Sequence, residues 1–157
     1  MKPYDPQKAA QVWQRVRAQQ PDPPQPPRDL NLSALIMEKL TMAAAYQQLS
    51  RQLNARQSAA LQRLGREELA HAACLKGICI LVTGEAPAVQ TPATEKDAPL
   101  LALRKCCGRE MRSLRDYESR VSDPEYGPVF RRLAEQEWEH CRTLLELIGS
   151  LPPSQGR

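Results

Sequence analysis

The chain has 157 residues and a net charge of +4. This length is enough for one domain with a buried core. Its arginines are scattered and only 4% of its residues are aromatic, which argues against nucleic acid as a partner. No apolar run approaches the roughly 20 residues of a membrane span, and the first residues lack the apolar core of a signal peptide. The five cysteines form no Cys-x-x-Cys pair and indicate reduced thiols, so we expect a cytoplasmic protein.

Residues 1–29 are predicted to form an N-terminal arm. Asp5 as N-cap and Pro6 at the first helical position predict a short helix over residues 6–20. Its apolar face is too small to fold alone, so we expect it to dock on the main domain or on a second subunit. Residues 21–29 contain five prolines and predict a stiff, extended connector.

Residues 30–151 are predicted to form four long helices. Each helix carries apolar residues at the alternating three-and-four spacing of one buried stripe. The helices cover about residues 31–57, 58–82, 100–121 and 125–150. No glycine or proline separates the first two, which are therefore either antiparallel neighbours or one bent helix. Residues 152–157 are predicted to form a mobile tail.

The connection between the second and third helices is long and contains three prolines in residues 85–99. A helix of 25 residues is about 37 Å long, and 15 extended residues span roughly 50 Å. The connection can therefore return along the whole bundle, which permits the second and third helices to be parallel.

Two of the apolar stripes are interrupted by a glutamate and a histidine three residues apart. One stripe contains Glu68 and His71, the other contains Glu137 and His140, and the chain has no other histidine. Glu-x-x-His places both side chains on one helix face, one turn apart, where they can bind one metal centre. Without a compensating partner, these groups would be costly to bury among leucines.

Two further glutamates, Glu38 and Glu110, lie on the stripes of the first and third helices, 72 residues apart. The two Glu-x-x-His pairs are 69 residues apart, so the chain contains a weak repeat of a helix pair. Four carboxylates and two imidazoles can bind two metal ions, and such ligands suit iron or manganese as well as zinc. The predicted metal ligands are Glu38, Glu68, His71, Glu110, Glu137 and His140. The alternative is a hydrogen-bonded polar core without metal.

With Glu68-Leu69-Ala70-His71 and Glu137-Trp138-Glu139-His140 on the second and fourth helices, the chain resembles the ferritin-like superfamily of di-iron carboxylate proteins, and most of all its rubrerythrin branch. The resemblance implies an all-α, ferritin-like four-helix bundle with a long crossover. It also implies a site for two iron ions, with manganese as the alternative and zinc as a possible substitute metal. The implied activity is that of an oxidoreductase that reacts with peroxide or dioxygen. The chain lacks the two Cys-x-x-Cys pairs of a rubredoxin-like domain, so an external electron donor is expected.

The tyrosines depart from the pattern of this family, which often places a tyrosine seven residues after each lone glutamate. Tyr117 follows Glu110 by seven residues and is interpreted either as a catalytic-site residue that donates a hydrogen bond to a ligand or as ordinary core. Tyr46 follows Glu38 by eight residues and Lys39 by seven. Either a one-residue bulge restores the register of the first helix, or the site is altered on that side.

Other assignments stay open at this level. Ser113 stands where rubrerythrins carry an additional glutamate, which weakens the case for their peroxidase mechanism. A dimanganese catalase would use a similar ligand set. Ferroxidase activity with iron storage would need a large hollow assembly, and a non-enzymatic scaffold would use the N-terminal arm to bind a partner. We expect a homodimer or a larger homo-oligomer. Glu67 is next to the predicted ligand Glu68 but lies off the apolar stripe, so we interpret it as solvent-facing.

Overall fold

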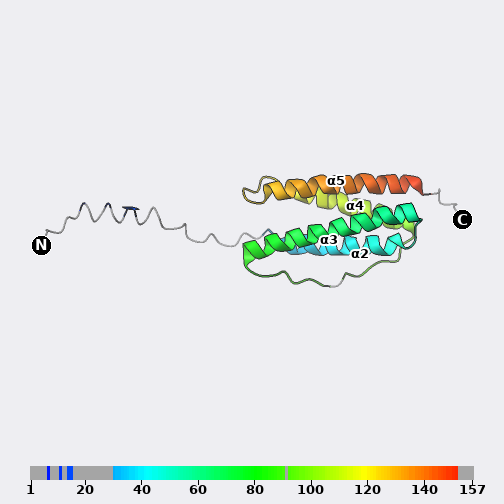
Figure 1. Ribbon diagram of the computed structural model, residues 1–157, viewed down its shortest axis with the longest axis horizontal. Helices are drawn as coiled ribbons and strands as arrows, with labels where there is room; N and C mark the ends of the chain where they lie inside the picture. The colour runs from blue at the N-terminus through cyan, green and yellow to red at the C-terminus, as the bar shows by residue number, and fades with distance from the viewer. Residues whose placement is uncertain (1–6, 8–10, 12–13, 16–29, 91, 152–157) are drawn as a thin grey trace.

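The computed structural model of the protein describes residues 7, 11, 14–15, 30–90 and 92–151 (Figure 1). Within these ranges the chain forms four long helices and no strand: α2 (Leu32–Ser50), α3 (Ala55–Thr83), α4 (Pro99–Glu118) and α5 (Gly127–Ser150). The prediction of an all-helical bundle is confirmed. The predicted connector and tail lie outside the described residues, as does the predicted N-terminal helix except for four residues. None of the described helices combines the length and the apolar character that a membrane span needs.

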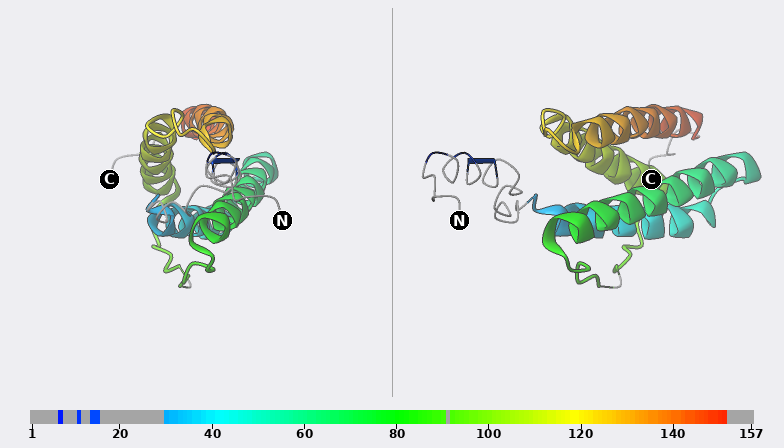
Figure 2. Two further views of the ribbon diagram at one scale, coloured as in Figure 1. Left: turned by 90° about the vertical axis from the view of Figure 1, so that its left-hand side faces the viewer. Right: turned by 60° about the vertical axis from the view of Figure 1, so that its left-hand side comes forward.

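The helices lie in two antiparallel pairs, α2 with α3 and α4 with α5 (Figure 2). The connection from α3 to α4 returns along the outside of the first pair, so α3 and α4 run in the same direction (Figure 1). Contacts with α2 hold this connection in place. Gln48 Nε2 donates to the carbonyl oxygen of Glu95 at 3.2 Å, and the backbone N–H of Gln90 lies 3.4 Å from Met37 Sδ.

The boundary between α2 and α3 was predicted several residues too late. α2 ends at Ser50 and α3 begins at Ala55, so the two helices are antiparallel neighbours. Asn54 is the N-cap, and its side-chain oxygen accepts a hydrogen bond from the backbone N–H of Gln57 at 3.0 Å. Such a cap satisfies one of the free N–H groups of the first turn, which explains a boundary that no glycine or proline marks.

The buried apolar residues form two clusters, one toward each end of the bundle. The first contains Leu35, Ile78 and Phe130, and the second contains Leu61 and Leu103, each with further residues of the same kind. Between the two clusters, each helix contributes at least one buried ionisable side chain. The fold therefore places the candidate site at the middle of the bundle, with apolar side chains on both sides of it.

Gly127 lies where the chain turns from α4 into α5. A Cβ atom there would lie 2.4 Å from the carbonyl oxygen of Val121, whereas a Cβ atom at the exposed Gly77 of α3 would meet nothing within 4 Å. We expect Gly127→Ala to lower the free energy of unfolding by about 1–3 kcal/mol. The control Gly77→Ala should raise it by about 0.5–1 kcal/mol, because alanine favours the helix. Urea denaturation followed by circular dichroism measures both, and a stabilising Gly127→Ala would contradict the close contact.

Candidate metal centre

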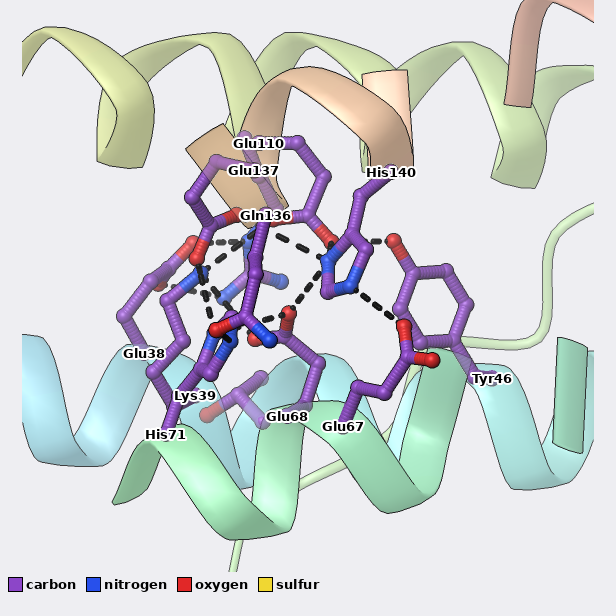
Figure 3. Close-up of polar contacts among 12 residues, drawn as sticks. Glu38, Lys39, Tyr46, Glu67, Glu68, His71, Glu110, Gln136, Glu137 and His140 are labelled. Carbon is purple, nitrogen blue, oxygen red and sulfur yellow. Dashed lines mark hydrogen bonds and ion pairs between the residues drawn. The ribbon is translucent and has the colours of Figure 1, made fainter. Parts of the chain in front are cut away.

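Six ionisable side chains meet between the two apolar clusters (Figure 3), and each is at most 2% exposed. They come from all four helices, because the three-and-four spacing turns one side of each helix inward. α2 contributes Lys39, α3 contributes Glu68 and His71, α4 contributes Glu110, and α5 contributes Glu137 and His140. We call these six residues the buried cluster.

The two predicted Glu-x-x-His pairs face each other across α3 and α5. Glu68, His71, Glu137 and His140 each offer one ligand atom, and these atoms all lie within 4.8 Å of one another. The imidazole rings are stacked, with their centroids 5.4 Å apart. This Glu/His group could hold a metal ion. The sequence predicted both pairs, and the packing of α3 near α5 brings them together.

Both imidazoles are oriented by residues at the outer edge of the cluster (Figure 3). His71 Nε2 lies 3.0 Å from Gln136 Oε1, and His140 Nε2 lies 2.8 Å from Glu67 Oε2. A neutral ring that donates from Nε2 keeps its lone pair on Nδ1, and outer partners of this kind are typical of metal-binding histidines. No spacing in the sequence indicated either partner. Glu67 was interpreted as solvent-facing, but it is only 34% exposed.

The Nδ1 atoms of both rings point into the cluster. His71 Nδ1 lies 3.0 Å from Glu137 Oε1, and His140 Nδ1 lies 2.8 Å from Glu68 Oε1. Within the described ranges, the buried atoms without an aligned hydrogen-bond partner include both carboxylate oxygens of Glu68, Glu137 Oε2 and His140 Nδ1. Buried polar atoms are rarely left in this state. Carboxylate oxygen and imidazole nitrogen are ligands for iron, manganese and zinc, so these residues fit a divalent metal ion.

Lys39 provides a cation at the centre of the buried cluster. Its Nζ lies 3.0 Å from Glu68 Oε2, 3.2 Å from Glu110 Oε2 and 2.5 Å from Glu137 Oε1. Burial alone would lower the pKa of Lys39, but the three carboxylates raise it well above its ordinary value. The side chain is therefore an ammonium ion. The sequence contained one signal of this role, the spacing of seven residues between Lys39 and Tyr46.

Glu38 lies outside the buried cluster, although the sequence analysis included it among the ligands. Its carboxylate is 29% exposed and accepts two hydrogen bonds from Arg109, from Nε at 2.6 Å and from Nη2 at 2.7 Å. α2 is a continuous α-helix with Lys39 and Tyr46 on its buried side. The helix therefore has no bulge to bring Glu38 inward, and it presents the neighbouring lysine instead.

The two tyrosines have different surroundings. Tyr46 is fully buried and donates a hydrogen bond to Glu110 Oε1. Tyr117 is also fully buried, but its hydroxyl has no hydrogen-bond partner in the part of the chain that the structure describes. The ring centroid of Tyr117 lies 5.7 Å from Lys39 Nζ. The hydrogen bond to a carboxylate that the sequence suggested for Tyr117 is thus made by Tyr46.

The protons of the metal-free cluster are held unequally. Burial, with the hydrogen bond and charge of Glu110, raises the pKa of Glu137 to about 10. Burial alone would lower the pKa of His140, but hydrogen bonds and charges of neighbouring carboxylates raise it to about 10. Burial and the charge of Lys39 lower the pKa of His71 to about 4. Near neutral pH, Glu137 and His140 therefore carry protons that a metal ion would displace.

A surface pocket of about 510 Å³ lies beside the cluster, and its lining includes His71, Gln136, Glu67, Cys74 and Arg132. Gln136 contacts His71 Nε2 at the edge of this pocket. The pocket therefore reaches the outer edge of the buried cluster at His71.

Comparison of the chain with protein-family models finds no match, and comparison with curated proteins finds no significant match either. The functional interpretation therefore rests on the geometry and chemistry of the buried Glu/His group.

Proposed function

We propose that the protein binds iron, or alternatively manganese, at the Glu/His group and reacts the reduced metal with peroxide or dioxygen, as in a rubrerythrin-like oxidoreductase of ferritin-like fold. The observation that carries this proposal is the arrangement of Glu68, His71, Glu137 and His140, whose ligand atoms lie within 4.8 Å of one another. Among the described residues, both carboxylate oxygens of Glu68, Glu137 Oε2 and His140 Nδ1 are buried without an aligned hydrogen-bond partner, which supports it.

The surrounding residues have roles that agree with this chemistry. Conversion of hydrogen peroxide into two water molecules takes two electrons and two protons. Ferrous iron held by these residues would supply one electron per ion, and the external donor would supply any electron that the bound iron does not. Gln136 and Glu67 hold the imidazoles in orientation, and Tyr46 and Lys39 hold the carboxylate of Glu110. The apolar clusters on both sides keep bulk water away from the site. An external donor would return the electrons.

Metal content per chain tests the proposal. We expect protein that is purified without chelators, or loaded anaerobically with ferrous iron, to retain iron through gel filtration. The double variant Glu68→Ala/His71→Ala should lose the metal, because it removes two of the four ligands and leaves the helices otherwise intact. Elemental analysis measures the iron, and circular dichroism checks that the variant is helical.

Glu38→Ala is the matched control, because Glu38 was a predicted ligand and lies outside the buried cluster. This variant should retain as much iron as the unaltered protein. The iron-loaded protein should consume hydrogen peroxide, and the double variant should not. An unaltered protein that retains neither iron nor manganese after anaerobic loading would refute metal binding, and a metal-loaded protein that is inert to peroxide and dioxygen would refute the chemistry.

A further inference from the structure

The contacts of the Lys39 ammonium are those of a bound cation. Nζ lies within 3.2 Å of oxygens from Glu68, Glu110 and Glu137, and its side chain is completely buried. Two of these carboxylates, those of Glu68 and Glu137, also belong to the Glu/His group. The ammonium thus lies among these three carboxylates (Figure 3), and a second metal ion would compete with it for the same oxygens.

The spacing between Lys39 and Tyr46 indicates that Lys39 takes the place of a fourth carboxylate, which a site for two metal ions would use. Lys39 precedes Tyr46 by seven residues, as Glu110 precedes Tyr117. Tyr46 donates to Glu110, but the hydroxyl of Tyr117 has no partner within the described ranges. An ammonium has no lone pair to accept that hydrogen bond. A glutamate at position 39 could accept a hydrogen bond from Tyr117, whereas Lys39 cannot, which explains the unpaired hydroxyl.

Glu38 does not replace this missing carboxylate. Both of its oxygens are bound to Arg109, at 2.6 and 2.7 Å, on the partly exposed side of α2. A bidentate pair with arginine holds a carboxylate in a defined geometry. α2 therefore contributes a positive charge to the buried cluster and no oxygen ligand.

The formal charges of the cluster set how many divalent ions it can hold. Once a metal ion has displaced the protons of Glu137 and His140, the three carboxylates of Glu68, Glu110 and Glu137 and the ammonium of Lys39 sum to −2 (three negative charges and one positive), which one divalent ion neutralises. Two such ions would leave +2 in a fully buried site, and uncompensated buried charge is costly. A glutamate at position 39 would bring the sum to −4, which matches two divalent ions.

We propose that Lys39 makes this a one-ion site: one divalent cation binds to Glu68, His71, Glu137 and His140, and the Lys39 ammonium takes the place of the second. This inference rests on the proposed function and replaces the two ions that the sequence suggested with one. The site is then a metal–ammonium pair that shares the carboxylates of Glu68 and Glu137.

Manganese binding tests this inference without an activity assay. Anaerobic equilibrium dialysis with Mn²⁺ should give one ion per chain for the unaltered protein, and its electron paramagnetic resonance spectrum should be that of isolated Mn²⁺. Lys39→Glu should bind two ions per chain and give the spectrum of an exchange-coupled pair. Lys105→Glu makes the same charge change at an exposed lysine, and this control should bind one ion.

The outcomes separate the two proposals. Two ions in the unaltered protein would overturn the one-ion site and leave the proposed function standing. No ion in the unaltered protein would overturn both. One ion in a folded Lys39→Glu variant would refute the idea that the lysine takes a cation position. If that variant does not fold, the stoichiometry and spectrum of the unaltered protein still decide between one ion and two.

Discussion

Replacing Lys39 with methionine is expected to lower the free energy of unfolding of the metal-free protein by about 3–5 kcal/mol, because the substitution removes the buried cation that contacts the carboxyl groups of Glu68, Glu110 and Glu137. Nζ lies within 3.2 Å of an oxygen from each of them. Methionine keeps an unbranched apolar side chain of similar length, so the loss reports mainly on the charge. Urea denaturation in the presence of a chelator measures the difference.

Glu38→Gln is the control for this prediction, because it weakens a partly exposed ion pair between α2 and α4. Its cost should be about 1 kcal/mol or less. Added Mn²⁺ should restore part of the stability of Lys39→Met, since a ligand that binds only the folded state stabilises it and supplies the missing positive charge. Equal losses in Lys39→Met and Glu38→Gln would show that the ammonium is not the central cation of the cluster.

Raising the pH from 7 to 10 is expected to destabilise the metal-free protein. The folded state raises the pKa of Glu137 and of His140 to about 10, whereas the unfolded chain has ordinary values of about 4.3 and 6.5. Over this range the folded state holds protons that the unfolded state has released, so stability falls with pH. For His140 the contribution is complete below about 6.5, for Glu137 below about 4.3, and each is lost as the pH passes about 10. His71 does not act in this window, because its pKa is lowered to about 4.

The melting temperature between pH 7 and pH 10, with a chelator present, measures this effect. The variant His140→Gln keeps the other titratable groups of the protein. If its melting temperature falls less steeply with pH than that of the unaltered protein, part of the loss of stability is assigned to His140. Metal affinity should change in the opposite direction and rise with pH, by about tenfold per pH unit for each proton displaced. Calorimetry in buffers of different ionisation enthalpy counts those protons. A melting temperature that rises toward pH 10 would contradict the retention of protons on Glu137 and His140.

In α2, the sequence pattern was ambiguous about which of two neighbouring residues faces the core. Glu38 and Lys39 are neighbours, and successive residues of an α-helix point about 100° apart. α2 carries apolar residues on most of its circumference, so its stripe did not define which neighbour faces inward. The spacing from Lys39 to Tyr46, which equals that from Glu110 to Tyr117, was the better guide. In α3 and α5 the apolar stripe is narrower and charged residues lie on the rest of the helix surface, so the inward-facing side could be identified from the sequence.

The sequence by itself determined the four helices, the long crossover and the two Glu-x-x-His pairs, because each depends on spacing along a few turns of one helix or on the length of one connection. Only the tertiary structure decided that Lys39 is the central cation, that Glu38 pairs with Arg109, and that Glu67 and Gln136 orient the imidazoles. Those contacts join residues 29 to 98 positions apart. They depend on how each helix is rotated about its axis and packed against the others, which local periodicity does not specify.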